Sequence, residues 1–310
     1  MQSENEPILL TGATGFLGSR VLDQLITAEH PTIVLVRNPS KLNEQARSNN
    51  NIDVIQGDFH DTSLVNDIIN RLRPNRILHL AWTGVASGQR NDLIQIANLR
   101  SSLSMLEQAM QYDVQSFLAI GSQAEYGHFN KRVLEADHGI PTSLYGETKL
   151  AMGSVGNRLC EKGPIRFIWM RLFSCYGPGD REEALIPYVI RELLHDRIPR
   201  LTAGTQLWDY LFVDDAAIAI LHAAFHPSLQ GIVNLGSGTT VRIKQVIELI
   251  RDQVSPGKEL PFGSIQTTSN SLFHLEAGID KLKLSGWEPR TELTDGITQT
   301  IAAIRRQFNL

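Results

Sequence analysis

The sequence predicts an α/β fold, a doubly wound parallel sheet with a smaller α/β domain interleaved at its end. Three observations predict it. A glycine-rich turn, between Gly12 and Gly18, follows the first apolar run. Apolar, β-branched runs then alternate with helix-period segments, as in a parallel sheet covered by helices on both faces. From about Cys175 this alternation loosens, and prolines and glycines gather between Pro178 and Gly204.

The glycine-rich turn is predicted to hold a phosphate. The run Pro7–Leu10 has the length and bulk of a buried strand, and a helix-period segment begins at Phe16. A strand that turns directly into a helix leaves unpaired N–H groups where the helix dipole favours an anion. Gly12, Gly15 and Gly18 permit a tight turn, close approach to a pyrophosphate and close helix–strand packing. An ordinary strand–helix loop with three glycines remains the alternative.

The other elements follow in order. Six further apolar runs are predicted as strands: Thr32–Arg37, Ile52–Gln56, Ile77–Ala81, Ser116–Ser122, Ile165–Arg171 and Ile232–Leu235. Helices are predicted at Leu64–Leu72, Leu93–Met110, Leu144–Leu159 and Leu293–Phe308. Ligands of such sheets bind at the carboxyl ends of the strands, near the point where the strand order reverses. We therefore expect functional residues directly after each strand.

The chain is predicted to form two interleaved domains. A regular strand–helix pattern returns at Trp208–Gly236, after the irregular stretch that begins at Cys175. Residues 1–174 and 208–237 are therefore assigned to a dinucleotide-binding, Rossmann-type domain. Residues 175–207 and 238–310 are assigned to a substrate-binding domain.

Composition excludes several functional classes. A hydrophobic fraction of 42% and a charged fraction of 20% are typical of a soluble globular protein, and a net charge of −4 argues against nucleic acid as a partner. No apolar window is long enough for a membrane helix, and the first six residues, MQSENE, do not resemble a signal peptide. Two cysteines, Cys160 and Cys175, make no disulfide framework. We expect a cytoplasmic protein with no membrane partner, and we identify no metal site.

The end of the second predicted strand favours NADP(H) over NAD(H). Enzymes that use NAD usually carry an acidic residue here, which binds the ribose 2′-hydroxyl. This chain has Val36 and Arg37 instead. A guanidinium suits a 2′-phosphate, although Arg37 as a solvated loop charge, with NAD(H) as the cofactor, remains possible.

A hydroxyl, a phenol and an amine follow the predicted strands in a catalytic pattern. Ser122 ends one strand, and Tyr145 and Lys149 lie one turn apart near the start of a helix, so they face the same side. A phenol with a pKa of about 10 is a poor acid–base catalyst at neutral pH. A neighbouring ammonium and a cationic nicotinamide ring favour the phenolate and lower that pKa.

These motifs together resemble the extended, sugar-nucleotide branch of the short-chain dehydrogenase/reductase superfamily. The opening TGATGFLG is typical of that branch, and the resemblance covers nearly the whole chain. Later segments that are similar to its signatures are Arg171–Gly179, Trp208–Asp215, Val233–Gly238 and Gly286–Pro289. Such proteins often dimerise by pairing two long helices, for which Leu93–Met110 and Leu144–Leu159 are the candidates. The resemblance thus implies a homodimer.

The resemblance also implies roles for individual residues. Tyr145 is the acid–base, Ser122 orients the substrate oxygen, Lys149 hydrogen-bonds the nicotinamide ribose and Asn98 belongs to a proton relay. Asp58 accepts a hydrogen bond from adenine. The implied cofactor-binding residues are Gly12, Thr14, Gly15, Phe16, Leu17, Gly18, Arg37, Asp58, Phe59, Ala81, Tyr145 and Lys149.

Departures from the family pattern concern the substrate. Ser174 stands where an asparagine often meets the substrate, and Trp208 stands where an arginine often reaches its diphosphate. Thr267 and Thr268 occupy a region that often carries another arginine. Trp82 replaces an alanine, and either shapes a ring-binding pocket or packs in the core. The substrate-binding residues that we expect are Trp82, Gln123, Ser174 and Trp208.

Dehydration is disfavoured. Sugar 4,6-dehydratases of this branch place an Asp-Glu pair after the catalytic hydroxyl, one to protonate the leaving hydroxyl and one to abstract a proton. Here these positions are Gln123 and Ala124, and Glu125, one residue later, is expected to point the other way if the segment is strand-like.

The leading interpretation is an NADP(H)-dependent reductase of a nucleotide-linked 4-keto-6-deoxy sugar. The segments QAEYG and WDYLFVDD look most like members that reduce or epimerise such sugars. An epimerase with retained NAD is the alternative. A non-catalytic NAD(P)-binding sensor belongs to another class, and such proteins typically lose the Tyr or Lys that are both present here as Tyr145 and Lys149.

Overall fold

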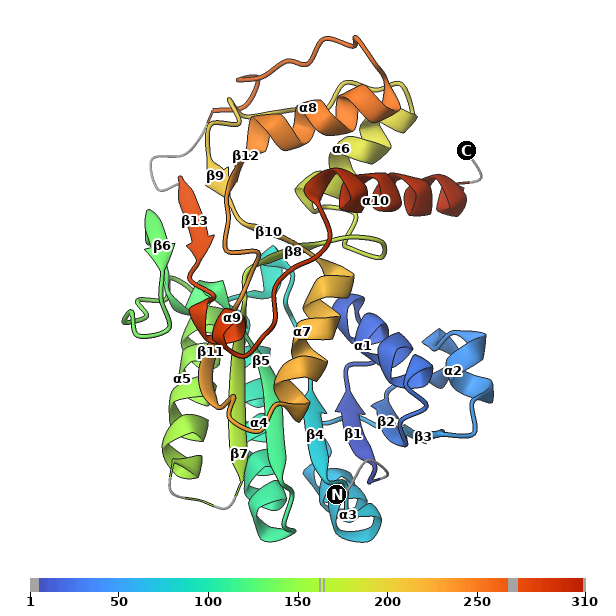
Figure 1. The fold of residues 1–310 in the computed structure, drawn as a ribbon, viewed down its shortest axis with the longest axis vertical. Coiled ribbons are helices and arrows are strands. Elements are labelled where there is room, and N and C mark those ends of the chain that lie inside the picture. The colour runs from blue at the N-terminus through green and yellow to red at the C-terminus, as the bar shows by residue number, and fades with distance from the viewer. Residues whose placement is uncertain (1–5, 162, 164, 267–272, 309–310) are drawn as a thin grey trace.

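A seven-stranded parallel sheet forms the centre of the molecule (Figure 1). The computed structural model describes residues 6–161, 163, 165–266 and 273–308. The strand order is β11 (Gly231–Leu235), β7 (Arg166–Leu172), β5 (Ser116–Ser122), β4 (Arg76–His79), β1 (Ile8–Thr11), β2 (Thr32–Val36) and β3 (Ile52–Gln56). The chain runs outwards from β1 to β3 and then returns to β4, so the strand order reverses between β1 and β4. The predicted doubly wound, Rossmann-type fold is confirmed.

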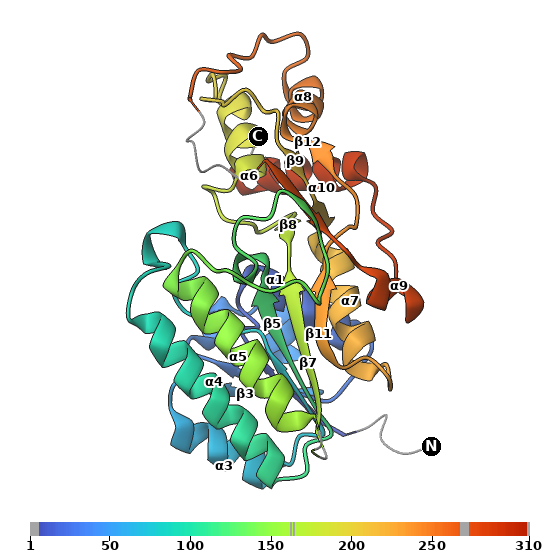
Figure 2. The same cartoon turned by 90° about the vertical axis from the view of Figure 1, so that its left-hand side faces the viewer.

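Helices cover both faces of this sheet (Figure 2). One face carries α3 (Thr62–Leu72), α4 (Ile94–Gln111) and α5 (Leu144–Cys160), and the other carries α1 (Phe16–Thr27) and α7 (Val213–Phe225). A short helix, α2 (Glu44–Ser48), follows β2 and the 3-10 turn η1 (Pro39–Lys41).

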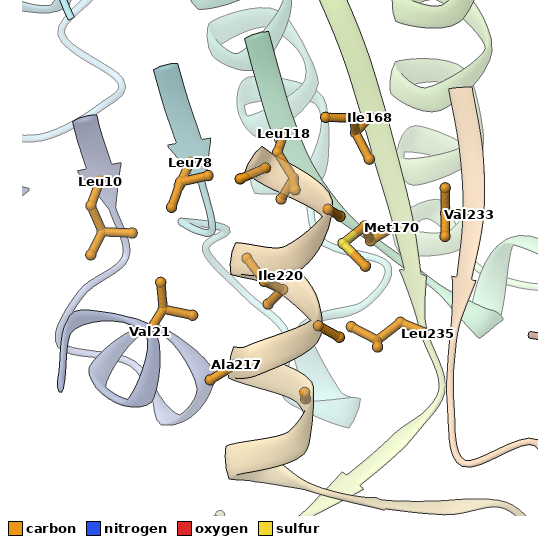
Figure 3. Close-up of a cluster of buried hydrophobic side chains, with 14 of the residues drawn as sticks. Leu10, Val21, Leu78, Leu118, Ile168, Met170, Ala217, Ile220, Val233 and Leu235 are labelled. Atoms are coloured by element: carbon orange, nitrogen blue, oxygen red, sulfur yellow. The ribbon is translucent and has the colours of Figure 1, made fainter. Parts of the chain in front are cut away.

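Two hydrophobic cores fill the space between the sheet and its helices. Leu118 packs with Leu10, Ile220 and other residues under α1 and α7 (Figure 3), whereas its neighbour Phe117 packs under α4 and α5. Successive side chains of a strand point to opposite faces, so a strand buried on both faces must be apolar throughout. This is why the central strands appear in the sequence as continuous apolar runs.

A second group of elements lies beyond the carboxyl ends of the strands, at the top of Figure 1. The helices α6 (Leu185–Leu194), α8 (Ile243–Val254) and α10 (Leu293–Phe308) surround a third hydrophobic core. A four-stranded sheet joins β12 (Val241–Arg242), β9 (Leu207–Trp208), β13 (His274–Ala277) and β6 (Lys131–Val133). A two-stranded sheet pairs β10 (Tyr210–Phe212) with β8 (Ser174–Tyr176). The short helix α9 (Asp280–Leu284) and the turns η2 (Ser87–Gln89) and η3 (Gln123–Glu125) complete the fold.

Most predicted elements are present with small shifts at their ends. The expected strands Ile52–Gln56 and Ser116–Ser122 and the expected helix Leu293–Phe308 have the observed bounds. The helices α6 and α8 and the short strands of the second group were not predicted. The division into two domains stays a prediction. We note that β6 comes from the segment assigned to the first domain but pairs with β13. None of the described helices is long and apolar enough to cross a membrane.

Candidate active site

Two connected cavities lie at the carboxyl ends of β1 and β4, where the strand order reverses. The larger, of about 630 Å³, extends from the start of α1 past β5 and α5 to β8 and β9. The smaller, of about 270 Å³, lies between the glycine-rich turn and the ends of β2 and β3. Both are lined by Gly12, Gly15, Leu80 and Trp82, so they form one continuous cleft. Every expected site residue of the described chain except Asn98 lines one of the two cavities.

The glycine-rich turn is shaped for an anion. Gly12 has a φ of +79°, and a Cβ there would lie 2.7 Å from the Ala81 backbone nitrogen. A Cβ on Gly18 would overlap the Gly12 carbonyl oxygen. α1 begins at Phe16 after Gly15, and within the described chain no side chain caps it and no acidic residue lies in its first turn. The first N–H groups of α1 therefore remain for a phosphate.

The smaller cavity offers groups suited to the adenosine end of a dinucleotide. Arg37 and Lys41 line it on one side, and Asp58 and Phe59 line it on the other. The Asp58 carboxylate accepts the His60 backbone N–H at 3.0 Å, which fixes this turn. Two cations beside a carboxylate fit a phosphorylated ribose and an adenine amino group. The cleft thus fits a nicotinamide dinucleotide along its length.

A buried histidine fixes the turn after β4. His79 Nδ1 lies 2.8 Å from Thr11 Oγ1 and its Nε2 lies 2.9 Å from Ser102 Oγ, so one ring joins β1, β4 and α4. Thr11 Oγ1 also accepts the Ala81 backbone N–H at 3.3 Å. Burial lowers the pKa of His79 to about 3. The neutral ring is a structural link that holds Ala81 and Trp82 at the cleft.

Ser122, Tyr145 and Lys149 meet in the larger cavity. Ser122 is the last residue of β5, and Ser143 caps α5 just ahead of Tyr145 by accepting the Gly146 N–H at 3.2 Å. Lys149 Nζ donates to the Ile120 carbonyl oxygen at 2.5 Å and lies 3.7 Å from the centre of the Trp82 ring. The Trp82 and Tyr145 rings are perpendicular at 6.4 Å. Trp82 is therefore a wall of the cavity in contact with Tyr145 and Lys149.

Burial dominates the ionisation of this pair. Burial lowers the pKa of Lys149 to about 7. The pKa of Tyr145 is raised, chiefly by burial, while the hydrogen bond with Ser122 and the charge of Arg90 act in the opposite direction. The sequence suggests Lys149 as the cation that lowers the phenol pKa. In the structure, the charges of Arg90 and Arg181, which both line the larger cavity, act in this direction.

Arg90 was missed by the sequence analysis. It comes from the loop between β4 and α4, lines the larger cavity, and its guanidinium carbon lies 5.2 Å from the centre of the Tyr145 ring. In the described chain its Nε is buried without a hydrogen-bond partner. Asp180, also missed, lines the same cavity, and burial raises its pKa to about 6. Nothing in the local sequence marks either residue, because only tertiary folding brings these loops to the cavity.

Asn98 lies away from the cleft. It is fully buried on α4, where its Oδ1 accepts the Thr83 N–H at 3.1 Å and its Nδ2 donates to the Thr83 carbonyl at 2.7 Å. Its amide thus anchors the loop after β4. The proton-relay role of Asn98 stays a prediction.

The two departures on the substrate side contact each other. Trp208 Nε1 donates to Ser174 Oγ at 2.6 Å, and both residues line the larger cavity together with Gln123 and Trp82. The Trp208 indole provides an aromatic face of the cavity, and the Ser174 hydroxyl provides a polar group. Thr267 and Thr268 lie outside the described residues.

Glu125 does not line the cavity, although its segment is the 3-10 turn η3 and not the strand on which the sequence-based expectation depended. It is fully buried behind β5 and forms an ion pair with Arg171 at 2.7 Å. Gln123 is the only one of these three η3 residues that lines the cavity. No carboxylate therefore stands at the positions that a sugar dehydratase uses.

Comparison with known proteins assigns the fold and cleft to a family. A family model described as the NAD dependent epimerase/dehydratase family matches residues 8–236. The chain belongs to this family. The expected membership of the extended short-chain dehydrogenase/reductase type is thereby confirmed, and the protein is an NAD(P)-dependent enzyme of that type.

Similar proteins cover nearly the full length of the chain. CDP-abequose synthase of Salmonella typhimurium is 28% identical over 96% of this chain and 97% of its own. The dTDP-4-dehydro-6-deoxyglucose reductase of Escherichia coli is 22% identical over 98% of this chain and 99% of its own. The crystal structure of UDP-glucose 4-epimerase from Thermus thermophilus in complex with NAD has a TM-score of 0.83 at 22% identity. That match covers 96% of this chain and 99% of the epimerase.

Proposed function

We propose that the protein is an NADP(H)-dependent reductase of a nucleotide-linked 4-keto-6-deoxy sugar. The observation that carries the choice of cofactor is the pair of cations, Arg37 and Lys41, on the smaller cavity. A reductase must release its oxidised cofactor after each turnover, and NADPH is the reductant that a 2′-phosphate site selects. A reductase of a 4-dehydro-6-deoxy sugar nucleotide also resembles this chain over nearly its full length.

The residues of the larger cavity suit carbonyl reduction. The bound nicotinamide cofactor supplies the hydride for the carbonyl carbon. Tyr145 donates its proton to the carbonyl oxygen, and Ser122 donates a hydrogen bond to the same oxygen and stabilises the charge that develops there. Lys149, behind Tyr145, supplies positive charge to the phenolate that remains. The raised pKa of Tyr145 keeps the phenol protonated at neutral pH, which is the form that a reductase needs.

The sugar is proposed to lie between Tyr145 and the wall formed by Ser174 and Trp208. The indole gives a flat face for a sugar ring, and the Ser174 hydroxyl accepts from Trp208 Nε1 and keeps its own proton for the substrate. Gln123 lines the cavity beside Ser122 but can neither protonate nor deprotonate a sugar. This arrangement favours reduction over dehydration.

An epimerase with retained NAD is the second candidate. One similar structure that binds NAD is a UDP-glucose 4-epimerase. In an epimerase, Ser122, Tyr145 and Lys149 would serve oxidation and reduction in turn. A non-catalytic sensor is disfavoured because Tyr145 and Lys149 are both in place on the cavity.

Calorimetry with NADPH and NADH on protein stripped of cofactor tests the proposal. We expect preference for NADPH, and we expect Arg37→Ala to weaken NADPH binding about ten- to a hundredfold with little effect on NADH, since a charge-assisted hydrogen bond is lost. Arg47→Ala, an exposed cation on α2 that lines neither cavity, is the matched control. Turnover of 4-keto-6-deoxy sugar nucleotides with NADPH should follow. Preference for NADH, or cofactor that cannot be removed, would favour the epimerase.

A further inference from the structure

A buried carboxylate lies directly behind the catalytic residues. Glu125 follows β5 in the turn η3 and is fully buried. It accepts the Ser122 backbone N–H at 2.7 Å, the Trp169 Nε1–H at 2.9 Å and the Arg171 Nε–H at 2.7 Å. All of these partners are donors, which is the environment that an ionised carboxylate requires and that a protonated carboxyl would satisfy only in part.

The backbone leaves room for this contact at Gly121. A Cβ on Gly121 would lie 2.5 Å from Glu125 Oε1, and it would overlap the Trp169 indole nitrogen. Real Cβ atoms do not approach other atoms so closely. A glycine at this position therefore lets the carboxylate reach the main chain of Ser122 from behind the strand.

The Trp169 indole lies between this carboxylate and the catalytic lysine. Its N–H donates to Glu125, and its ring centre is 5.5 Å from Lys149 Nζ. On its other side Lys149 Nζ approaches the Trp82 ring, and it donates to the Ile120 carbonyl. The ammonium thus has aromatic faces and one carbonyl around it, and no ion pair within the described chain, so a nearby negative charge matters for its ionisation.

Among the titratable groups near Lys149, Glu125 is the one that carries a negative charge. The titratable groups that face Lys149 are His79 of β4, Glu125 of η3 and Tyr145 of its own helix, with Arg171 of β7 behind Trp169. His79 is neutral because burial lowers its pKa to about 3. Burial lowers the pKa of Lys149 to about 7, and the charge of Glu125 acts in the opposite direction. Burial raises the pKa of Glu125, and Arg171 opposes that rise.

We propose that Glu125 is a positioning residue, which fixes the main chain of Ser122 and whose negative charge keeps Lys149 in its cationic form. The inference depends on Tyr145 and Lys149 acting together, as the proposed function assumes, but it holds for a reductase and for an epimerase alike. Arg171 completes the arrangement by keeping the carboxylate ionised.

Titration of Lys149 itself tests the proposal without any substrate. In protein labelled with [ε-¹³C]lysine, the signal of Lys149 is assigned by its absence in Lys149→Arg and followed against pH by NMR. Removal of a nearby opposite charge in Glu125→Gln should lower the titration midpoint by about one pH unit or more, a tenfold loss of proton affinity. Glu135→Gln is the matched control, since this carboxylate accepts the Asn234 N–H on a neighbouring segment and should leave the midpoint unchanged.

A double variant guards against misfolding. Glu125→Gln leaves Arg171 as an unpaired buried cation, whereas Glu125→Gln combined with Arg171→Met removes both charges, a replacement that is often tolerated. Loss of the Arg171 cation alone would raise the Lys149 midpoint, so a fall in the double variant must come from Glu125. An unchanged midpoint in folded Glu125→Gln, or in the double variant relative to Arg171→Met alone, would overturn the proposal. The high-pH limb of kcat should move down with the midpoint, while the cofactor preference tested above is independent of both.

Discussion

At the scale of single residues, Tyr145 is fixed from two sides. Its backbone N–H donates to the Arg90 carbonyl at 2.8 Å, and its ring lies between the Arg90 guanidinium and the Trp82 indole. A substitution that removes only the phenol oxygen should therefore leave the ring packed. Such a substitution tests the role of the hydroxyl group directly.

We expect Tyr145→Phe to lower kcat by about two to four orders of magnitude, the range of general acid catalysis, while NADPH affinity stays near that of the parent. Steady-state kinetics and calorimetry measure the two quantities. Tyr112→Phe, in which a half-buried tyrosine just after α4 and outside both cavities loses the same atom, is the matched control. Full turnover by Tyr145→Phe would remove Tyr145 from the mechanism and would revive the sensor interpretation.

His79 makes the stability of the fold depend on pH. Its pKa is about 3 in the folded protein against 6.5 as the ordinary value. Between these values the unfolded chain binds more protons, so the free energy of unfolding rises with pH there. The contribution of His79 is present above pH 6.5 and is lost, by several kcal/mol in total, as the pH falls toward 3.

Urea denaturation at a series of pH values checks this prediction. His79→Gln should flatten the acid side of the stability curve, because the titrating group is gone. The exposed His128→Gln serves as the control and should keep the slope of the parent. A His79→Gln variant with the parental slope would show that other groups cause the acid instability.

At the scale of elements, the packing of α1 on the glycine-rich turn sets the position of its N-terminus. Gly18 is the third residue of α1, with no space for a side chain against the Gly12 carbonyl. Alanine has a helix propensity that is more favourable than that of glycine by about 1 kcal/mol. This gain partly offsets the cost of the steric overlap. The balance of the two effects shows how closely the helix must approach the strand.

We expect Gly18→Ala to lower the free energy of unfolding by about 1–3 kcal/mol, as other overpacked sites do, and to weaken cofactor binding by moving the start of α1. Gly88→Ala is the control, since a Cβ on Gly88 has no atom within 4 Å in the described chain. Chemical denaturation and calorimetry measure both effects. A Gly18→Ala protein as stable as Gly88→Ala would mean that the turn can shift freely.

The elements also show what the sequence could reveal. Central strands buried on both faces were visible as apolar runs, and Ser116–Ser122 has its predicted bounds. Helix α8 carries apolar residues at helical spacing, including Val246, Ile247 and Ile250, so its signal was present but was passed over within an irregular stretch. Strands of two residues, such as β9, are too short for a period to appear.

The site residues also divide into those that the sequence could predict and those that it could not. The glycines, Ser122, Tyr145 and Lys149 belong to local motifs whose spacing fixes their geometry, and they line the cleft as the motifs indicated. Arg90 over Tyr145 could not be predicted, because a loop from another part of the chain brings it there. The hydrogen bond of Trp208 to Ser174 likewise joins residues 34 positions apart.

At the scale of the whole molecule, the cleft lies between the carboxyl edge of the seven-stranded sheet and the second group of elements. The strand order reverses between β1 and β4, which opens the cleft, and the segments from β8 to α6 close its far side. Residues assigned to the cofactor and to the substrate therefore line the same cavity. Both the reductase and the epimerase hypotheses need this proximity.

The outer face of α4 and α5 leads to the last prediction, a homodimer. These two helices lie side by side on one surface of the molecule (Figure 2). Three large apolar side chains on these helices, Ile96 near the start of α4 and Val155 and Leu159 in the second half of α5, are 41–43% exposed. Burial of this face against the same face of a second copy would remove them from water, at about 25 cal/mol per Å² of apolar surface.

Light scattering should give twice the monomer mass, and Val155→Lys should shift the protein to the monomer because a charge would be buried in the interface. Ile198→Lys is the control, since this residue is also exposed, at 61%, but lies after α6 in the second group of elements. A monomeric parent protein would exclude the dimer. A Val155→Lys protein that remains dimeric would place the interface on another face, while turnover in the monomer would show whether one copy completes the active site.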